Sequence, residues 1–222
     1  MELSTFIMLA LGLGLLHALD IDHLLAVSGI SGLHPADWRR SAGFSLRWAL
    51  GHGSSVLFLG SLVFVFGMAV PRAFSHYAEM LVGMMLFIIG SMLLLDWWKQ
   101  TRGNAKTINQ AGFTWSGRQQ EPYNILHQHR RGTVVVGLIH GTAGTAPLLL
   151  LMPLADNATP LTGMLFLLLF SVGVLLSMLL FGSILGKFFG KLLYHHQQGL
   201  QHVRLLLSIL TISLGLSLLV IH

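Results

Sequence analysis

The sequence predicts an all-α integral membrane protein with six transmembrane helices. Hydrophobic residues make up 54% of the 222 residues and charged residues only 9%, and the mean hydropathy is +0.72. Soluble domains carry roughly 25% charged residues, so this composition excludes an ordinary soluble fold. Six windows reach the length of about 20 apolar residues that a helix needs to cross the hydrocarbon layer. They lie near residues 4–30, 44–70, 78–98, 132–153, 160–187 and 203–221.

The first window carries four ionisable residues in an otherwise apolar run: His17, Asp20, Asp22 and His23. Such groups cost about 2.5–3.5 kcal/mol each at membrane depth, so they face a cavity or one another and mark an ion pathway. On a regular helix, which turns about 100° per residue, His17, Asp20 and His23 share one face. Asp22 lies about 140° from His17, so it needs local unwinding or it orients a histidine from behind. The competing interpretation is a buried polar network that only joins helices.

The first and fifth windows are longer than a minimal span, so their helices are expected to tilt or to break. In the first window, glycines are the expected break points. These are Gly12, Gly14, Gly29 and Gly32.

Two further histidines lie in the second and fourth windows, each beside glycine. His52 stands between Gly51 and Gly53, and His140 precedes a segment of small residues that ends at Pro147. Small residues allow close helix packing, and proline removes one helix hydrogen bond, so the fourth window is expected to unwind locally. His52 has an alternative interpretation as a core histidine with ordinary hydrogen bonds. The glycines have an alternative interpretation as residues that only allow tight helix packing.

Together these six residues predict a metal site. The chain contains no cysteine, so any metal site must use imidazole, carboxylate, carbonyl or thioether ligands. Imidazole suits divalent nickel, cobalt, zinc and copper, whereas a carboxylate-rich site favours magnesium or manganese. The candidate ligands are His17, Asp20, Asp22, His23, His52 and His140.

The distribution of basic residues predicts the orientation. With six spans, Arg72 is the only lysine or arginine on one side, and the other side receives the remaining twelve. By the positive-inside rule the twelve-residue side is cytoplasmic, and both termini lie outside the cytoplasm. This topology also explains the net charge of +5 without a nucleic-acid partner. The twelve residues are Arg39, Arg40, Arg47, Lys99, Arg102, Lys106, Arg118, Arg130, Arg131, Lys187, Lys191 and Arg204.

The chain divides into two halves of three helices, residues 1–98 and 132–222, joined by a polar cytoplasmic loop at 99–131. His127 and His129 in this loop are read as ordinary solvated residues, with metal handling as the alternative. Residues 14–17 (Gly-Leu-Leu-His) match residues 137–140 (Gly-Leu-Ile-His), and a glycine and serine pattern that begins at Gly51 recurs from Gly173. Two interpretations stay open: an inverted repeat, as in many transporters, and chance matching of common residues. The position that matches His52 is Val174, so the halves are chemically unequal.

Two segments resemble a known family. Residues 17–23 (His-Ala-Leu-Asp-Ile-Asp-His) resemble the H-x4-D-H signature of the nickel/cobalt transporter family, and residues 51–56 resemble its second signature. Residues 140–144 look like the shorter urease-accessory branch, whereas the acidic-and-threonine motif of the larger, commonly eight-span members is missing. The resemblance implies a secondary permease for Ni2+ or Co2+. The residues that match the family's metal-binding positions are His17, Asp22, His23 and His52.

The sequence therefore predicts a multi-pass permease of the cytoplasmic (inner) membrane that takes up Ni2+, and as a second candidate Co2+, as its substrate. No resident cofactor and no enzymatic activity are expected. The expected partners are the metal ion and the lipid bilayer, with a second copy of the chain and nickel-enzyme maturation proteins as further candidates. Metal efflux, an accessory or assembly role and, remotely, an intramembrane hydrolase pairing Ser54 or Ser55 with His140 are the alternatives.

Overall fold

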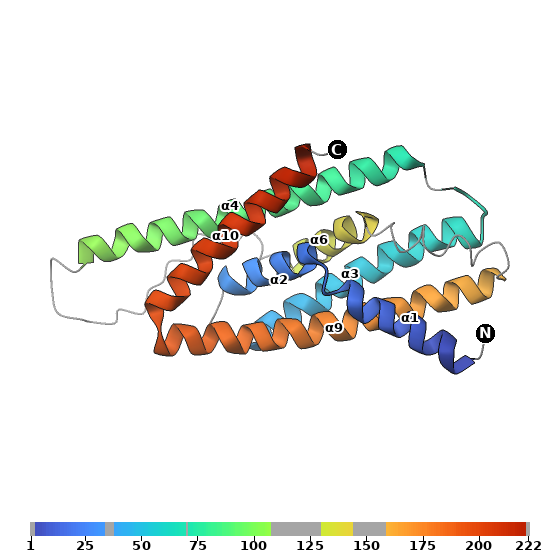
Figure 1. Ribbon diagram of the computed structural model, residues 1–222, viewed down its shortest axis with the longest axis horizontal. Helices are drawn as coiled ribbons and strands as arrows, with labels where there is room; N and C mark the ends of the chain where they lie inside the picture. Colours follow the sequence, from blue (N-terminus) through green and yellow to red (C-terminus); the bar gives the residue numbers. More distant parts are fainter. Residues whose placement is uncertain (1–2, 34–37, 70, 108–129, 144–158, 221–222) are drawn as a thin grey trace.

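The computed structural model describes residues 3–33, 38–69, 71–107, 130–143 and 159–220, and within these ranges it contains helices and no strand. Each of the six predicted windows holds helix in its described part, which confirms the all-α class (Figure 1). The helices are α1 (Leu3–His17), α2 (Ile21–Leu33), α3 (Trp38–Phe64), α4 (Arg72–Thr107), α6 (Arg130–Ala143), α9 (Pro160–His195) and α10 (Gln197–Val220).

The described helices differ in how well they suit a membrane crossing. Ala73–Arg102 in α4, Pro160–Leu192 in α9 and Gln198–Val220 in α10 are long and apolar enough, and the bent pair of α1 and α2 makes a fourth span if counted as one. In α6, Gly132–Ala143 is apolar but short, and residues 144–153 of its predicted window lie outside the described residues. Only 17 of the 27 residues of α3 follow its last arginine, Arg47. In the described residues, three of the six predicted crossings are therefore long and apolar enough to span a membrane, and the first is a fourth if its two helices form one span.

The first helix breaks inside the polar motif, so the prediction of a break at Gly12, Gly14, Gly29 or Gly32 is wrong. α1 ends at His17, α2 begins at Ile21, and their axes differ by 55°. The link is a tight turn in which the amide of Asp20 donates to the carbonyl of His17 at 3.0 Å. A helix end leaves backbone groups unpaired and so needs polar partners. Asp22 supplies one, because its Oδ1 accepts a hydrogen bond from the His23 amide at 2.8 Å.

The predicted loop at 99–131 is too long at both ends. α4 continues to Thr107, and Arg130 and Arg131 already belong to α6. The extension of α4 is held by α10, since Gln100 accepts hydrogen bonds from Gln201 and Arg204 at 2.7 Å each. Residues 108–129, including the predicted loop histidines at 127 and 129, lie outside the described residues.

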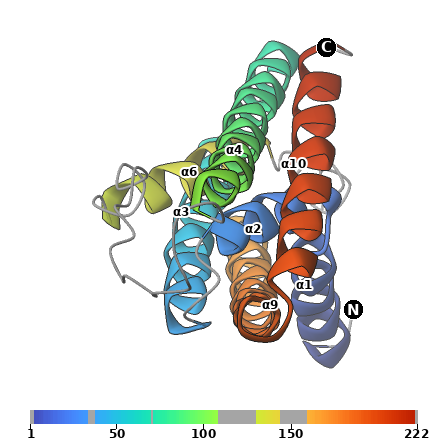
Figure 2. The same cartoon turned by 90° about the vertical axis from the view of Figure 1, so that its left-hand side faces the viewer.

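Two antiparallel helix pairs enclose α2. Glycines of α9 approach α3 in reverse order along the chain, with Gly163 beside Phe64 and Gly186 beside Ser41. α4 and α10 form the second pair, and α2 contacts both pairs (Figures 1 and 2). The motif at the junction of α1 and α2 is thereby placed inside the bundle.

The contacts between the two halves are reciprocal. A methyl group added at Gly14 would overlap the carbonyl oxygen of Phe170, and one added at the matching Gly137 would overlap the carbonyl oxygen of Trp48. Phe170 follows Trp48 by the same offset of 122 residues that relates Gly173 to Gly51. α1 therefore docks on α9 as α6 docks on α3, which is the pattern that a two-fold axis between the halves produces. Because α3 and α9 run antiparallel, the second half has the opposite direction to the first, as in an inverted repeat.

Candidate metal site

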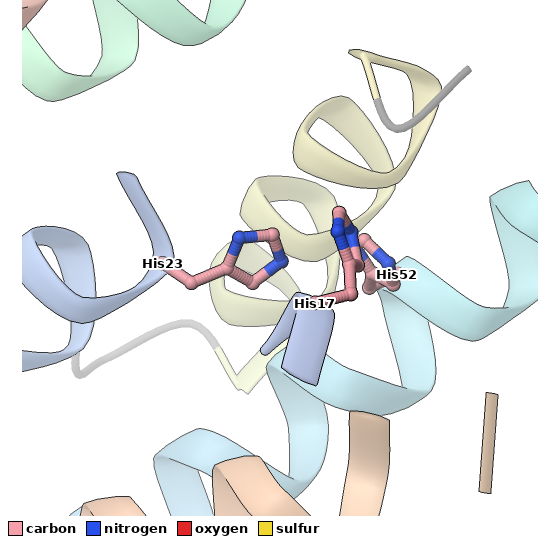
Figure 3. A group of neighbouring side chains, drawn as sticks. All are labelled: His17, His23 and His52. Carbon is pink, nitrogen blue, oxygen red and sulfur yellow. The ribbon is translucent and has the colours of Figure 1, made fainter. Parts of the chain in front are cut away.

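Three histidines from three helices converge where α1 ends. His17 is the last residue of α1, His23 lies in the first turn of α2, and His52 lies in the middle of α3 (Figure 3). Their ring centroids are 4.7 Å (His17–His23), 5.2 Å (His23–His52) and 5.4 Å (His17–His52) apart. One ligand atom of each lies within 4.8 Å of the others. The arrangement is able to hold a single metal ion with three imidazole nitrogens.

Four of the six ring nitrogens in this group lack hydrogen-bond partners among the described residues. Among the described residues, His17 Nε2, His23 Nε2 and both nitrogens of His52 are buried without one. A buried polar group with no partner costs about 1–3 kcal/mol, so native structures rarely retain several together without a reason. A bound cation would satisfy one nitrogen of each of the three rings.

A second group contains the carboxylate of Asp22. Its Oδ1 lies 3.1 Å from His23 Nδ1, and its Oδ2 lies 3.0 Å from His140 Nε2. His140 Nε2 is also 3.0 Å from His23 Nδ1, so the three side chains form a closed triangle. Asp22 thus contacts two imidazoles at once, and its bond to Nδ1 leaves His23 Nε2 as the nitrogen that faces His17 and His52.

The prediction that His17, Asp20 and His23 share the site on one regular helix face is wrong, because the helix breaks between them. The break brings Asp22 into the cluster and turns Asp20 out of it. The Asp20 side chain is 56% exposed, and its Oδ2 lies 2.8 Å from Nδ1 of His17. The local unwinding that Asp22 requires is present, and Asp22 also orients histidines, as the second expectation stated.

Helix ends of both signs meet at the site. α1 ends at His17, and the carboxyl end of a helix carries about half a negative charge, which favours positive ions within the last turn. The amino end of α2 at Ile21 carries the opposite partial charge, which the Asp22 carboxylate in its first turn offsets.

Two aromatic residues of the site were missed from the sequence. The Trp48 ring is parallel to that of His23, with centroids 6.1 Å apart, and meets His140 edge-on at 5.3 Å. On the other side, Phe170 lies 5.4 Å from His17. The position of Trp48 four residues before His52 on α3 was the available signal, because such residues share a helix face.

The hydroxyl groups beside His52 support helix docking rather than nucleophilic chemistry. Ser55 Oγ donates to the carbonyl of Leu138 in α6 at 3.0 Å, and Ser54 Oγ donates to the carbonyl of Leu50 at 2.7 Å. In the described part of the chain neither hydroxyl has a hydrogen bond to His140. The pairing that the hydrolase alternative requires is therefore not formed.

Comparison with known proteins gives one matching family and two similar individual proteins. Residues 23–217 match the family described as "Cytochrome C biogenesis protein transmembrane region". The urease accessory protein UreH of Bacillus sp. (strain TB-90) is 29% identical over 191 residues, covering 83% of this chain and 78% of that protein. The high-affinity nickel transport protein of Cupriavidus necator is 34% identical over 88 residues, covering 40% of this chain and 24% of that protein. No solved structure matches. These relatives confirm the resemblance to nickel transporters and to their urease-accessory branch.

Proposed function

We propose that this chain, which belongs to the family of the cytochrome C biogenesis protein transmembrane region, is a permease for a divalent transition-metal cation. Its substrate is Ni2+, and Co2+ is the second candidate. The observation that carries this proposal is the group of buried imidazole nitrogens without partners on His17, His23 and His52. Nitrogen donors of this kind select divalent nickel, cobalt, zinc or copper over magnesium or calcium. The similarity to a high-affinity nickel transport protein supports nickel within this set.

Each site residue has a role in this proposal. His17, His23 and His52 bind the ion, and His140 completes or gates the site. Asp22 orients His23 and His140, and Asp20 contributes negative charge near His17. Metal-binding histidines commonly hold their second nitrogen against a carboxylate, which is the relation between His23 and Asp22.

The proposed direction is uptake across the cytoplasmic membrane, with both termini outside. The excess of lysine and arginine on the loop side supports that side as cytoplasmic. A dication crossing 100 mV gains about 4.6 kcal/mol, which supports accumulation on the order of a thousandfold. The membrane potential is thus a sufficient driving force. We propose that the imported nickel is used in the maturation of a nickel enzyme, and the similarity to a urease accessory protein supports urease as a candidate.

Uptake of radiolabelled nickel by cells that express the wild type, His17→Ala or His202→Ala tests the proposal. His202 lies in α10 with an exposed side chain, so its replacement controls for the loss of a histidine far from the site. We expect accumulation by the wild type and His202→Ala, and at least about a tenfold loss for His17→Ala at equal membrane abundance. Unlabelled cobalt and zinc added as competitors rank the selectivity.

Three outcomes contradict uptake by this site. A wild type that lowers cellular nickel indicates efflux. Equal accumulation by the wild type and His17→Ala shows that the histidines do not carry the ion. Nickel-enzyme activity that is restored without any change in cellular nickel indicates an accessory role.

A further inference from the structure

His23 belongs to two ligand groups at once. His17, His23 and His52 form the first, which we name the open station, and Asp22, His23 and His140 form the second, the closed station. Nδ1 of His23 contacts Asp22 and His140 at 3.1 and 3.0 Å, whereas its Nε2 has no partner among the described residues. The two ring nitrogens of His23 are therefore divided between the stations.

The outer members of the two stations occupy matching positions in the two halves. His140 follows His17 by 123 residues, the offset that also relates Gly137 to Gly14. Each packs against an aromatic ring at matching positions, His17 on Phe170 at 5.4 Å and His140 on Trp48 at 5.3 Å. Each also lies in the last turn of its helix, α1 or α6. The two-fold pattern of the fold therefore relates these outer histidines and their aromatic neighbours, whereas His52 has no counterpart in the second half, where Val174 takes its place.

The stations differ in their hydrogen bonds. The nitrogens left to the open station have no partners, so a cation displaces nothing when it binds there. The donors of the closed station are 3.0 to 3.1 Å apart and bonded to one another. When two ligand atoms each lie about 2.1 Å from a metal ion and the angle between the two bonds is about 90°, the ligand atoms are about 3.0 Å apart. The donors of the closed station therefore already have the spacing of a coordination shell.

We propose that one ion occupies the open station first and then passes to the closed station by changing from one ring nitrogen of His23 to the other. This inference rests on the proposed transport function. In the open station Nε2 of His23 binds the ion and the hydrogen on Nδ1 stays with Asp22. In the closed station Nδ1 binds the ion and the ring hydrogen resides on Nε2. His140 likewise moves its hydrogen from Nε2 to Nδ1, so the number of protons on the two rings does not change.

The helix directions assign the stations to opposite sides. α1 reaches His17 from the side of the amino terminus, and α6 reaches His140 from the side of the polar loop (Figure 1). His17 also contacts the exposed Asp20, whereas the His140 side chain is 1% exposed. The open station therefore receives the ion from outside and the closed station releases it toward the cytoplasm. Because neutral His23 has one lone pair, the two stations hold one ion between them.

The test compares nickel binding with nickel transport in the same full-length variants. Binding is measured by equilibrium dialysis of radiolabelled Ni2+ against detergent-purified protein, and transport is measured in proteoliposomes with an imposed inside-negative potential. His140→Gln keeps an amide donor for Asp22 but removes the imidazole of the closed station. His52→Ala removes a ligand of the open station, and His202→Gln is the matched control on α10.

We expect one Ni2+ per wild-type chain. For His140→Gln we expect a dissociation constant within about threefold of the wild type and transport reduced at least about tenfold. His52→Ala is expected to weaken binding at least about tenfold. Monodisperse elution and an unchanged unfolding temperature of His140→Gln establish that the variant is folded, and His140→Asn replaces it if it is not.

Three outcomes overturn the transfer between stations while leaving the permease intact: wild-type transport by His140→Gln, binding lost equally in His140→Gln and His52→Ala, or two ions per wild-type chain. The second outcome describes a single site with His140 as an ordinary ligand. A wild type that neither binds nor transports nickel removes the proposed function itself.

Discussion

Two buried polar clusters in this bundle differ in how far their groups are satisfied. In the α4–α10 cluster, Arg204 Nη1 lies 3.2 Å from Asp96 Oδ2 and 2.7 Å from Gln100 Oε1, and Gln100 Nε2 donates to Asp96 at 2.7 Å. Gln201 Oε1 is the single buried side-chain atom of this cluster that lacks a partner among the described residues. The charged groups of this cluster are thus paired.

The histidine cluster has the opposite character. Its members are His17, Asp22, His23, His52 and His140. Five of its imidazole nitrogens are buried without partners in the described part of the chain: His17 Nε2, His23 Nε2, His52 Nδ1, His52 Nε2 and His140 Nδ1. Paired buried groups specify how helices meet, whereas unpaired ones lower stability unless a ligand satisfies them. The difference separates a cluster whose groups satisfy one another, as in a structural support, from one whose free nitrogens fit the proposed cation.

The largest effect on stability is expected at Arg204. Its replacement in Arg204→Met leaves the Asp96 carboxylate without its cation, and breaking a buried ion pair in this way costs about 3–5 kcal/mol. Thermal unfolding in detergent, followed by tryptophan fluorescence, measures the loss. The double variant Asp96→Asn/Arg204→Met is expected to recover most of it. If uptake per folded molecule falls while stability is unchanged, Arg204 lies in the ion pathway. The two clusters would then not differ in role.

The largest effect on transport is expected at His23, because it belongs to both stations. In His23→Ala, nickel uptake should fall at least about a hundredfold, equivalent to about 2.7 kcal/mol. The unfolding temperature should change far less than in Arg204→Met, since the removed ring left one nitrogen unpaired. Uptake and thermal unfolding of the same preparations decide this. A folded His23→Ala that transports at the wild-type rate would contradict a site at this residue.

The two aspartates of the motif provide a smaller, internally matched effect. Asp22→Asn weakens the orientation of two imidazoles, and loss of such a carboxylate typically costs 10–100-fold in metal affinity, so we expect about a tenfold or greater loss of nickel binding. Asp20→Asn should change binding by less than about threefold, since the Asp20 side chain is 56% exposed and pairs with one histidine, His17, where Asp22 pairs with two. Equilibrium dialysis of the two variants side by side measures the contrast. Equal losses would mean that Asp20 joins the site when the ion is bound.

The smallest expected effect has the opposite sign. In His52→Leu a buried ring with two unpaired nitrogens is replaced by an apolar side chain of similar size, so the free energy of unfolding should rise by about 1 kcal/mol in the absence of metal. Nickel added at saturating concentration should stabilise the wild type and not the variant. Thermal unfolding with and without nickel gives both values. Destabilisation of His52→Leu without metal would show that His52 supports the fold.

Much of this arrangement is readable from single residues and their spacing. The apolar windows locate the helices because a bilayer demands about 20 apolar residues for each span. Ionisable residues in such windows are expensive, so His17, Asp22, His23, His52 and His140 stand out as functional candidates before any contact is known. The α4 extension to Thr107 does not stand out, because the hydrogen bond from Arg204 to Gln100 that ties α4 to α10 joins residues far apart in the sequence.

The sequence by itself determined the membrane class, the types of ligand and the matching positions of His17 and His140, since these depend on composition and on spacing along one chain. Tertiary structure decided the rest. The break after His17 exchanged the roles of Asp20 and Asp22, and only the crossing of α1, α2, α3 and α6 decided which imidazole nitrogens face one another. Helical periodicity describes a straight helix, whereas a coordination shell depends on positions to within about 0.5 Å, which packing alone sets.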